Sequence, residues 1–217
     1  MNPNAAIIGA AAVLLGALLF FERQDSTGGK LLTKLPLSIL FILAAVLQPH
    51  PHSAYYHRLL VGLILCFVGD GCLIFKGRGL FLTGLIAFLA GHGFYTAAFF
   101  TLSTVNVAFV FVLVFTAAVG WAIYLWLRPH LNGLKIPVTA YIVVISLMVC
   151  AAGGVFAGAA VSDAARWMVL GGAVFFYLSD LFVARNRFVR RGFENRLVGL
   201  PLYYSGQFLL AFSVGRV

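Results

Sequence analysis

A succession of long apolar runs constrains this chain more than any other feature of its sequence. The runs cover approximately residues 4–21, 33–48, 58–76, 80–101, 105–127, 135–157, 164–185 and 197–215. About 20 apolar residues form a helix long enough to cross the hydrocarbon core of a bilayer, where only helices and closed barrels satisfy the backbone. Barrel strands would instead alternate polar and apolar residues over about ten positions. We therefore expect an all-α fold, a single transmembrane domain over residues 1–217 built as a polytopic membrane helical bundle of about eight helices.

The overall composition agrees with this expectation. Apolar residues make up 62% of the 217 and charged residues only 10%, whereas a soluble domain carries roughly a quarter charged residues. The first run has no basic segment before it, so we interpret it as a retained helix rather than a cleaved signal peptide. The fourth and fifth runs are separated only by the polar stretch 103–106, and merging them would give seven helices instead.

The basic residues are distributed unequally between alternate connections. The connections after the first, third, fifth and seventh helices hold Arg23, Lys30, Lys34, Lys76, Arg78, Arg128, Lys135, Arg185, Arg187, Arg190, Arg191 and Arg196. The opposite side holds Arg58, Arg166 and Arg216. The positive-inside rule then puts the basic loops in the cytoplasm and both termini outside, and we expect a bacterial inner (cell) membrane. This placement explains the net charge of +9 without a nucleic-acid partner. Anionic lipid head groups are a compatible second partner for the basic loop 185–196.

Two aspartates, Asp70 and Asp180, interrupt otherwise apolar runs. An ionised carboxylate near a bilayer centre costs about 3 kcal/mol on insertion-based scales, so membrane segments rarely carry one without use. Each lies about two turns before the basic end of its predicted helix, in related patterns that begin at Phe67 and Tyr177. The repeat suggests that helices 3–4 and 7–8 form a parallel internal repeat about an axis along the membrane normal, with the two aspartates facing each other. A purely structural role, as hydrogen-bond partners of neighbouring helices, is the alternative.

Other polar side chains are expected at the depth of the two aspartates. At 1.5 Å of rise per residue they are His92, Tyr95, Tyr141, Tyr203, Tyr204 and Gln207, with Lys34 at the rim. Their convergence predicts a polar cavity that opens toward the cytoplasmic side. Structural alternatives remain: an interhelical hydrogen bond for His92, an interfacial belt for Tyr203 and Tyr204, and a snorkelling charge for Lys34. No Cys or His spacing indicates a metal site, and we expect neither a metal nor a cofactor.

Several stretches of the chain resemble the lysoplasmalogenase (YhhN-like) family of membrane proteins. They are residues 33–37, Gly69-Asp70, residues 84–88 with His92 and Tyr95, Ser179-Asp180 followed by residues 186–188, and residues 203–207. The resemblance implies hydrolysis of the vinyl ether bond of lysoplasmalogen, an alkenyl glycerophosphoethanolamine or glycerophosphocholine, to a fatty aldehyde and a glycerophospho head group. It implies catalytic roles for Asp70 and Asp180, and substrate binding by Lys34, His92, Tyr95, Tyr141, Asn186, Arg187, Tyr203, Tyr204 and Gln207. Lys34 is then the first candidate for a contact with the lipid phosphate, and Arg187 the second.

The chemistry of that reaction suits a pair of carboxyl groups. Protonation of the vinyl ether gives an oxocarbenium ion, and glycosidases meet the same ion with a general acid and a second carboxylate. Two alternatives use the same aspartates: a proton-coupled transporter with carboxylate relays, and an intramembrane aspartyl protease with a shared-proton dyad. Neither aspartate-bearing run contains the proline of a broken transporter helix, and Phe67–Asp70 lacks the Gly-x-Gly-Asp pattern of the protease. No sequence feature indicates an oligomeric state.

Overall fold

A computed structural model describes residues 3–103, 105–131 and 133–217, and within them the chain is a bundle of helices without strands. The long helices are α1 (Pro3–Arg23), α2 (Thr27–Val46), α3 (Ser53–Ile74), α4 (Arg78–Phe99), α5 (Val107–Leu127), α6 (Lys135–Ala157), α7 (Asp163–Ala184) and α8 (Phe193–Ser213). A 3-10 turn, η1 (Arg128–His130), follows α5, and a π-helical turn, η2 (Arg185–Val189), follows α7. The prediction of eight helices is confirmed, and the seven-helix alternative is wrong because α4 and α5 are separate helices. Thr104, in the predicted turn, lies outside the described residues.

Three helices begin clearly earlier than the apolar runs predict, and one of them is α3, which starts at Ser53 rather than near residue 58. Helix α2 starts at Thr27 rather than near residue 33, because the Ser26 side chain caps it by accepting a hydrogen bond from the Gly29 backbone N–H at 3.2 Å. Helix α8 starts at Phe193 rather than near residue 197. The earlier start of α2 puts Lys34 almost two turns inside that helix. The expectation that Lys34 marks the rim of the bundle is therefore wrong.

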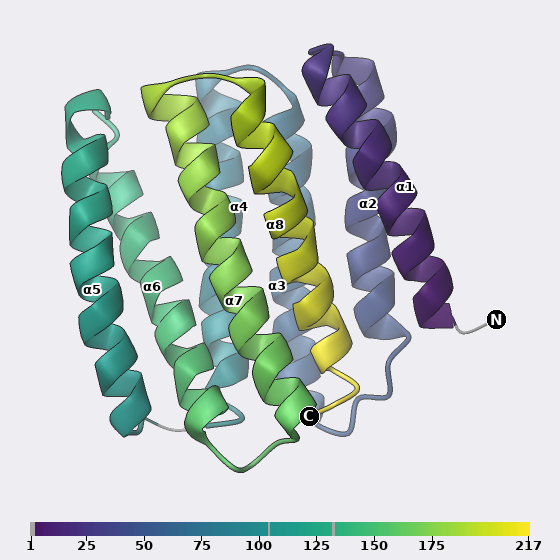
Figure 1. Ribbon diagram of the computed structural model, residues 1–217, viewed down its shortest axis with the longest axis vertical. Coiled ribbons are helices and arrows are strands. Elements are labelled where there is room, and N and C mark those ends of the chain that lie inside the picture. The colour runs from purple at the N-terminus through teal and green to yellow at the C-terminus, as the bar shows by residue number, and fades with distance from the viewer. Residues whose placement is uncertain (1–2, 104, 132) are drawn as a thin grey trace.

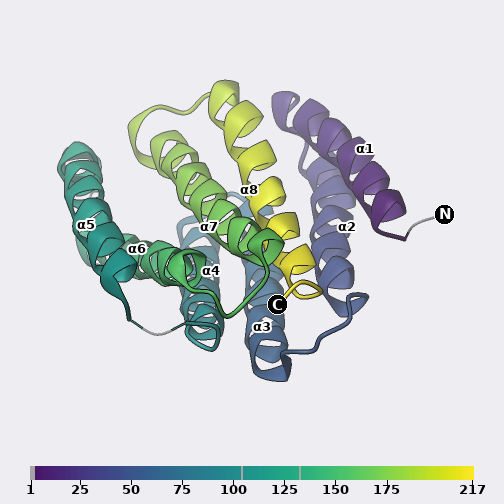
Figure 2. The same ribbon diagram turned by 60° about the horizontal axis from the view of Figure 1, so that its bottom comes forward.

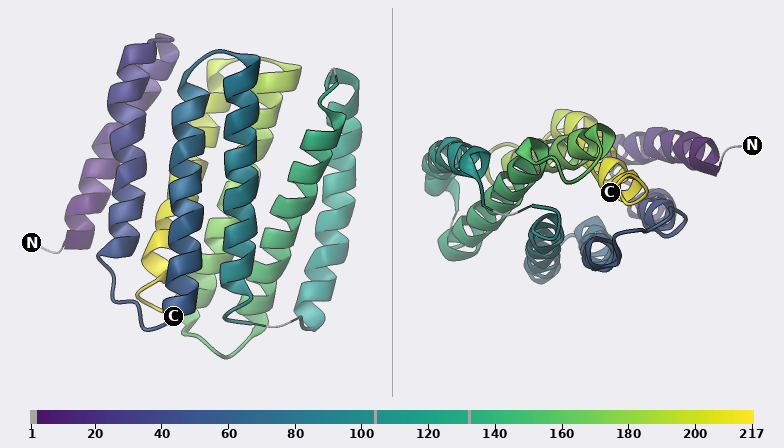
Figure 3. Two further views of the ribbon diagram at one scale, coloured as in Figure 1. Left: turned by 180° about the vertical axis from the view of Figure 1, so that it is seen from behind. Right: turned by 90° about the horizontal axis from the view of Figure 1, so that it is seen from below.

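The eight helices run alternately up and down. The connections α1–α2, α3–α4, α5–α6 and α7–α8 therefore all lie at one end of the bundle (Figure 1). These are the connections that carry most of the lysines and arginines, and this end is called the basic end below. Both termini lie toward the opposite end, and the same arrangement is visible from behind in Figure 3. The predicted grouping of the charges at one end of the molecule is confirmed.

Seven of the described helices are long and apolar enough to cross a membrane, and the chain is an integral membrane protein. Their outward faces are apolar; on α5, for example, Phe111 and Phe115 are 73% and 68% exposed. Helix α8 is not among the seven because several of its side chains are polar. Those polar side chains, Asn195, Tyr203, Tyr204, Gln207 and Ser213, are buried inside the bundle, where other helices supply their partners.

The two halves of the chain pair their helices in the same way. Contacts between α1 and α2, α2 and α3, and α3 and α4 recur between α5 and α6, α6 and α7, and α7 and α8. The contact of α2 with α8 recurs as the contact of α6 with α4. Viewed along the bundle, the α3–α4 pair lies across from the α7–α8 pair (Figure 2; Figure 3, right). This pattern agrees with the predicted parallel repeat.

Glycines at corresponding positions let the two helices within each central pair, α3–α4 and α7–α8, approach each other closely. A Cβ on Gly91 would lie 3.2 Å from the Gly62 carbonyl oxygen, and one on Gly206 would lie 2.9 Å from the Gly172 carbonyl oxygen. Small residues let membrane helices approach this closely. Gly62 and Gly172 each precede the aspartate of their helix by the same number of residues, so both carboxyl groups are set at the same height.

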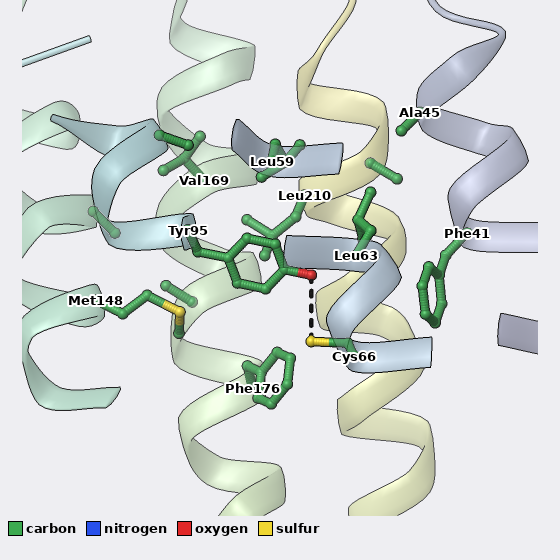
Figure 4. Close-up of a cluster of buried hydrophobic side chains, with 14 of the residues drawn as sticks. Phe41, Ala45, Leu59, Leu63, Cys66, Tyr95, Met148, Val169, Phe176 and Leu210 are labelled. Atoms are coloured by element: carbon green, nitrogen blue, oxygen red, sulfur yellow. Dashed lines mark hydrogen bonds between the residues drawn. The ribbon is translucent and has the colours of Figure 1, made fainter. Parts of the chain in front are cut away.

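The apolar core fills the space between these pairs (Figure 4). Fully buried side chains such as Leu63, Phe176 and Leu210 come from α3, α7 and α8. The hydroxyl of Tyr95 on α4 points into this core and lies 3.6 Å from the Cys66 Sγ (Figure 4). Close packing here holds α3 and α7 rigidly and so fixes where their two aspartates lie.

Candidate active site

Both carboxylate oxygens of Asp70 have side-chain partners. Its Oδ1 lies 2.9 Å from the Lys34 ammonium, and its Oδ2 accepts from the Ser38 hydroxyl at 2.6 Å and the Tyr203 hydroxyl at 2.7 Å. Lys34 also donates to the Asp70 backbone carbonyl at 3.4 Å. The two side chains of the ion pair are only 5% and 2% exposed. Removing either partner of such a pair would leave the other as a buried, uncompensated charge.

A second layer of hydrogen bonds fixes the groups that hold Asp70. The Tyr203 hydroxyl accepts from Gln207 Nε2 at 3.1 Å, and Gln207 Oε1 accepts from the Tyr95 hydroxyl at 2.7 Å. The Tyr204 hydroxyl lies 3.2 Å from the Ser38 hydroxyl. Tyr95, Tyr204 and Gln207, expected to bind substrate, therefore lie behind Asp70 and do not line the cavity described below. Their assignment as substrate-binding residues stays a prediction.

Ser38 is a site residue that the sequence interpretation missed. It lies one helical turn after Lys34 on α2, so the two side chains share a face. A polar residue one turn from a lysine in an otherwise apolar run was the available signal. The sequence does not show which helix that face meets.

The carboxyl group of Asp180 has a different environment. Its Oδ2 accepts from the Tyr141 hydroxyl at 2.6 Å and lies 3.9 Å from Nε2 of His92. Among residues 3–103, 105–131 and 133–217, no lysine or arginine nitrogen lies within 4.0 Å of it. The His92 ring is completely buried, packs edge-on against Phe176 at 4.5 Å, and has no hydrogen-bond partner on either nitrogen within the described chain. Asp180 is thus held by hydrogen bonding rather than by a cation.

The two aspartates occupy equivalent places in the repeat but have unlike neighbours. The helix before each aspartate-bearing helix supplies a different partner. Helix α2 supplies Lys34 to Asp70, and α6 supplies Tyr141 to Asp180. The helix from the other half contributes Tyr203 to Asp70 and His92 to Asp180. Each aspartate lies four residues before the end of its α-helix, about one turn rather than the predicted two. Two equivalent positions of the repeat therefore hold carboxyl groups in different electrostatic environments.

Both aspartates line one cavity of about 100 Å³ in the basic half of the bundle. Its other polar lining residues include Lys34, Tyr141 and Tyr203, and its walls are mainly apolar side chains such as Phe81, Leu85, Phe88, Ile145 and Leu200. The volume is below the roughly 300–1,000 Å³ of pockets that enclose small ligands. No group of three or more His, Cys, Asp or Glu side chains in the described parts of the chain is arranged to hold a metal ion.

A polar basin of about 520 Å³ adjoins the cavity at the basic end. Its charged lining consists of Arg23, Lys30, Lys76, Arg187, Arg190, Arg191 and Arg196, with Glu22 and Asp25. Asp25, in the connection between α1 and α2, lies 2.9 Å from Lys30, 2.6 Å from Lys76 and 3.3 Å from Arg191. Hydrogen bonds from Lys76 and then Lys30 hold the pKa of Asp25 well below its ordinary value. The Asp25 carboxylate thus links the α1–α2, α3–α4 and α7–α8 connections.

Asn186 and Arg187 both lie on η2 but face different partners. The Asn186 Oδ1 accepts from the Gly192 backbone N–H at 3.1 Å and from Asn195 Nδ2 at 3.3 Å, which fastens the connection to α8. The Arg187 guanidinium lies 4.2 Å from the centre of the Phe81 ring and lines both the cavity and the basin. Arg187 is therefore at the junction between the apolar and the charged space.

Comparison with known proteins gives a consistent result over most of the chain. The chain is 35% identical to the human lysoplasmalogenase TMEM86A over 182 residues, which is 80% of this chain and 72% of that protein. It is 32% identical to the lysoplasmalogenase TMEM86B of Sus scrofa over 196 residues, covering 90% and 79% of the two chains. A lysoplasmalogenase of Mycobacterium bovis is 32% identical over 177 residues, covering 77% and 63%. No solved structure matches the chain. Because the family model described as YhhN matches residues 29–214, the chain belongs to the YhhN family.

Proposed function

We propose that this protein hydrolyses the vinyl ether bond of lysoplasmalogens and releases a fatty aldehyde and a glycerophospho head group. Relatives that cover most of the chain are named lysoplasmalogenases, which supports the reaction class. The observation that carries the mechanism is the pair of aspartates on one apolar cavity, one with a cation and one without. The enzyme would lie in a bacterial inner membrane with its basic end in the cytoplasm and both termini outside.

The reaction requires a proton at one carbon and a water molecule at the next. Transfer of a proton to the β-carbon of the vinyl ether leaves an oxocarbenium ion at the α-carbon. Water adds to that carbon and gives up a proton, and the resulting hemiacetal breaks its carbon–oxygen bond to give the aldehyde and the glycerol hydroxyl. One group must therefore begin as an acid, and another must tolerate a positive charge beside it.

Asp180 is the proposed acid. A carboxyl group in a mainly apolar cavity and without a lysine or arginine partner is better accommodated in its neutral form. Asp180 lines such a cavity, its side chain is 18% exposed, and no such partner lies within 4.0 Å in the described residues. The Tyr141 hydroxyl fixes Oδ2, which leaves Oδ1 to carry the proton toward the substrate. His92, beside the same oxygen, is a proposed positioning residue for this carboxyl group.

Asp70 is the proposed carboxylate that stabilises the oxocarbenium ion and accepts the proton of the attacking water. Lys34 keeps it ionised, and Ser38 and Tyr203 keep it oriented. The Lys34 ammonium is already bound to Asp70, so its proposed role is to maintain that charge rather than to contact the lipid phosphate. The same pairing disfavours a protease dyad, because carboxyl groups that share one proton must ionise as a unit.

Aldehyde release from a panel of alkenyl, alkyl and acyl lysophospholipids tests the proposal with purified protein. We expect release from the alkenyl lipids alone. Asp70→Asn and Asp180→Asn should each lower turnover at least about 10²-fold, a typical loss for a general acid or base. Asp163→Asn, at an exposed acid where α7 begins, is the matched control. Absence of aldehyde release by the folded wild-type protein would refute the activity, and near-normal turnover in either test variant would remove that aspartate from the mechanism.

A further inference from the structure

The apolar cavity does not offer a binding site for the charged part of the proposed substrate. A lysophospholipid carries a phosphate, and the cavity of about 100 Å³ is small and has mainly apolar walls. The basin beside it is several times larger and is rich in arginine and lysine. The two spaces share the lining residues Leu73, Phe81, Val183, Arg187, Phe188 and Arg196. A molecule with an apolar reacting end and an anionic head can therefore occupy both.

Most cations of the basin already have acidic partners. Lys30, Lys76 and Arg191 surround Asp25, and Arg196 Nε lies 3.7 Å from Glu22 Oε2. In the described part of the chain, the arginines of the basin without an acidic side chain within 4.0 Å are Arg23, Arg187 and Arg190. Of these three, Arg187 alone also lines the apolar cavity. Its charge is available at the place where head group and reacting bond meet.

The fold holds Arg187 in a defined position. It lies in the π-helical turn η2, and such wide turns often occur at functional sites. The two residues before Arg187 fasten the turn: Arg185 donates to Asn195 Oδ1 at 2.6 Å, and Asn186 accepts from the Gly192 backbone N–H. The guanidinium carbon lies over the Phe81 ring, 4.2 Å from its centre, and this cation–π contact helps to hold the group in place. A planar guanidinium matches the geometry of a phosphate better than an ammonium does.

The separation between Arg187 and Asp180 fits the length of a lysophospholipid head. The two residues are seven positions apart, roughly 10 Å along a helix at about 1.5 Å per residue. About seven bonds, the last of them the carbon–carbon double bond, join the phosphorus of such a lipid to the β-carbon of its vinyl ether. At roughly 1.2 Å of reach per bond, the spacing of an extended chain, they span about 8 Å. The axial spacing of the two residues is therefore comparable with the distance between the phosphate and the reacting carbon, and both residues line the same cavity.

We propose that the basin binds the phosphate group of a single-chain glycerophospholipid, with Arg187 as its anchor. This inference rests on the proposed function, because it assumes that the reacting bond lies at Asp180. The positive-inside rule accounts for the number of cations at this end. It does not account for an arginine without an acidic partner where the two spaces join.

Binding of a non-cleavable alkyl lysophospholipid tests the site independently of catalysis. The variants are Arg187→Gln and the matched control Arg78→Gln, which removes an exposed arginine at the same end that lines neither space. Because the basin is open to solvent, we expect Arg187→Gln to weaken binding by about 10-fold, the lower limit for a hydrogen bond to a charged group. Binding to Arg78→Gln should be unchanged, and Arg187→Lys should lose less than Arg187→Gln. Equal losses in the Arg78 and Arg187 variants, or none in Arg187→Gln, would overturn the proposal.

Two further ligands identify what Arg187 recognises. An alkylglycerol with the same chain but no phosphate should bind wild type and Arg187→Gln equally, and an equal loss for both lipids would indicate a merely structural role. Inorganic phosphate should bind far more weakly than the lysolipid. If it binds as tightly, and in an Arg187-dependent way, the basin is a site for free phosphate and the lipid assignment is wrong.

The outcome is separable from that of the proposed function. Arg187-dependent binding of the alkyl lipid, without aldehyde release from alkenyl lipids, would refute the hydrolase and leave the phosphate site standing. Aldehyde release with the same Michaelis constant in wild type and Arg187→Gln would support the hydrolase and refute the phosphate site.

Discussion

Replacement of Lys34 by methionine separates two roles for that lysine. The substitution keeps a long unbranched side chain in α2 but leaves the Asp70 carboxylate without its cation. Neither partner is more than 5% exposed, so solvent screens the pair very little. Removal of one partner of a buried ion pair typically costs about 3–5 kcal/mol. Without its cation, a carboxyl group in a mainly apolar site is better accommodated in its neutral form.

A neutral Asp70 can no longer stabilise a developing cation. We therefore expect Lys34→Met to lower kcat by at least about 10²-fold, the usual size of a lost acid–base contribution, with little change in KM. A phosphate contact by Lys34 would have the opposite signature: a KM raised by about 10-fold or more with kcat nearly unchanged. Both constants are measured from aldehyde release in detergent at a controlled mole fraction of lipid.

Thermal unfolding of the same variants gives a readout independent of activity. Lys34→Met should unfold at a lower temperature than wild type. The double variant Lys34→Met/Asp70→Asn should recover much of that loss, because it no longer buries an unpaired carboxyl group. If the single and double variants are equally stable, or if only KM changes, the reasoning about the buried ion pair is wrong.

Three further predictions concern the proton, the helix contact and the orientation. Because the proposed acid delivers its proton to carbon, turnover in D₂O should leave one deuterium on the carbon next to the aldehyde group, as measured by mass spectrometry; unlabelled aldehyde would exclude this route. Gly206→Ala should destabilise the bundle by about 1–3 kcal/mol, because its Cβ would lie 2.9 Å from the Gly172 carbonyl oxygen. Gly93→Ala, whose Cβ would meet nothing within 4 Å, should not lower the unfolding temperature, and an equal loss in both variants would contradict the packing argument. Cysteines placed in residues 185–196 should resist an impermeant reagent in intact cells while those near residues 50–57 react, and the reverse pattern would invert the orientation.

Much of the architecture was predictable from the sequence because its causes are local. A run of about 20 apolar residues in a bilayer has no alternative to a helix, and this requirement fixes the number of helices and their alternation. The same logic identified Asp70 and Asp180, since a carboxyl group in such a run is conspicuous wherever its helix packs. The start of α2 was predicted too late because Gly28, Gly29 and Lys30 do not continue the apolar pattern, although the Ser26 cap extends the helix over them.

The partners of the two aspartates were decided by tertiary structure. Lys34 and Asp70 are 36 residues apart in the chain, Tyr203 and Asp70 are 133 apart, and Tyr141 and Asp180 are 39 apart. Each contact depends on the rotation of two helices about their own axes, and packing against all the neighbouring helices sets that rotation. The repeat in the sequence makes the two aspartates look alike, yet a lysine reaches one and a tyrosine reaches the other. The sequence by itself therefore determined which carboxyl groups lie in the membrane, whereas only the packed bundle decided which of them has a cation, because charge pairing depends on distances across helices.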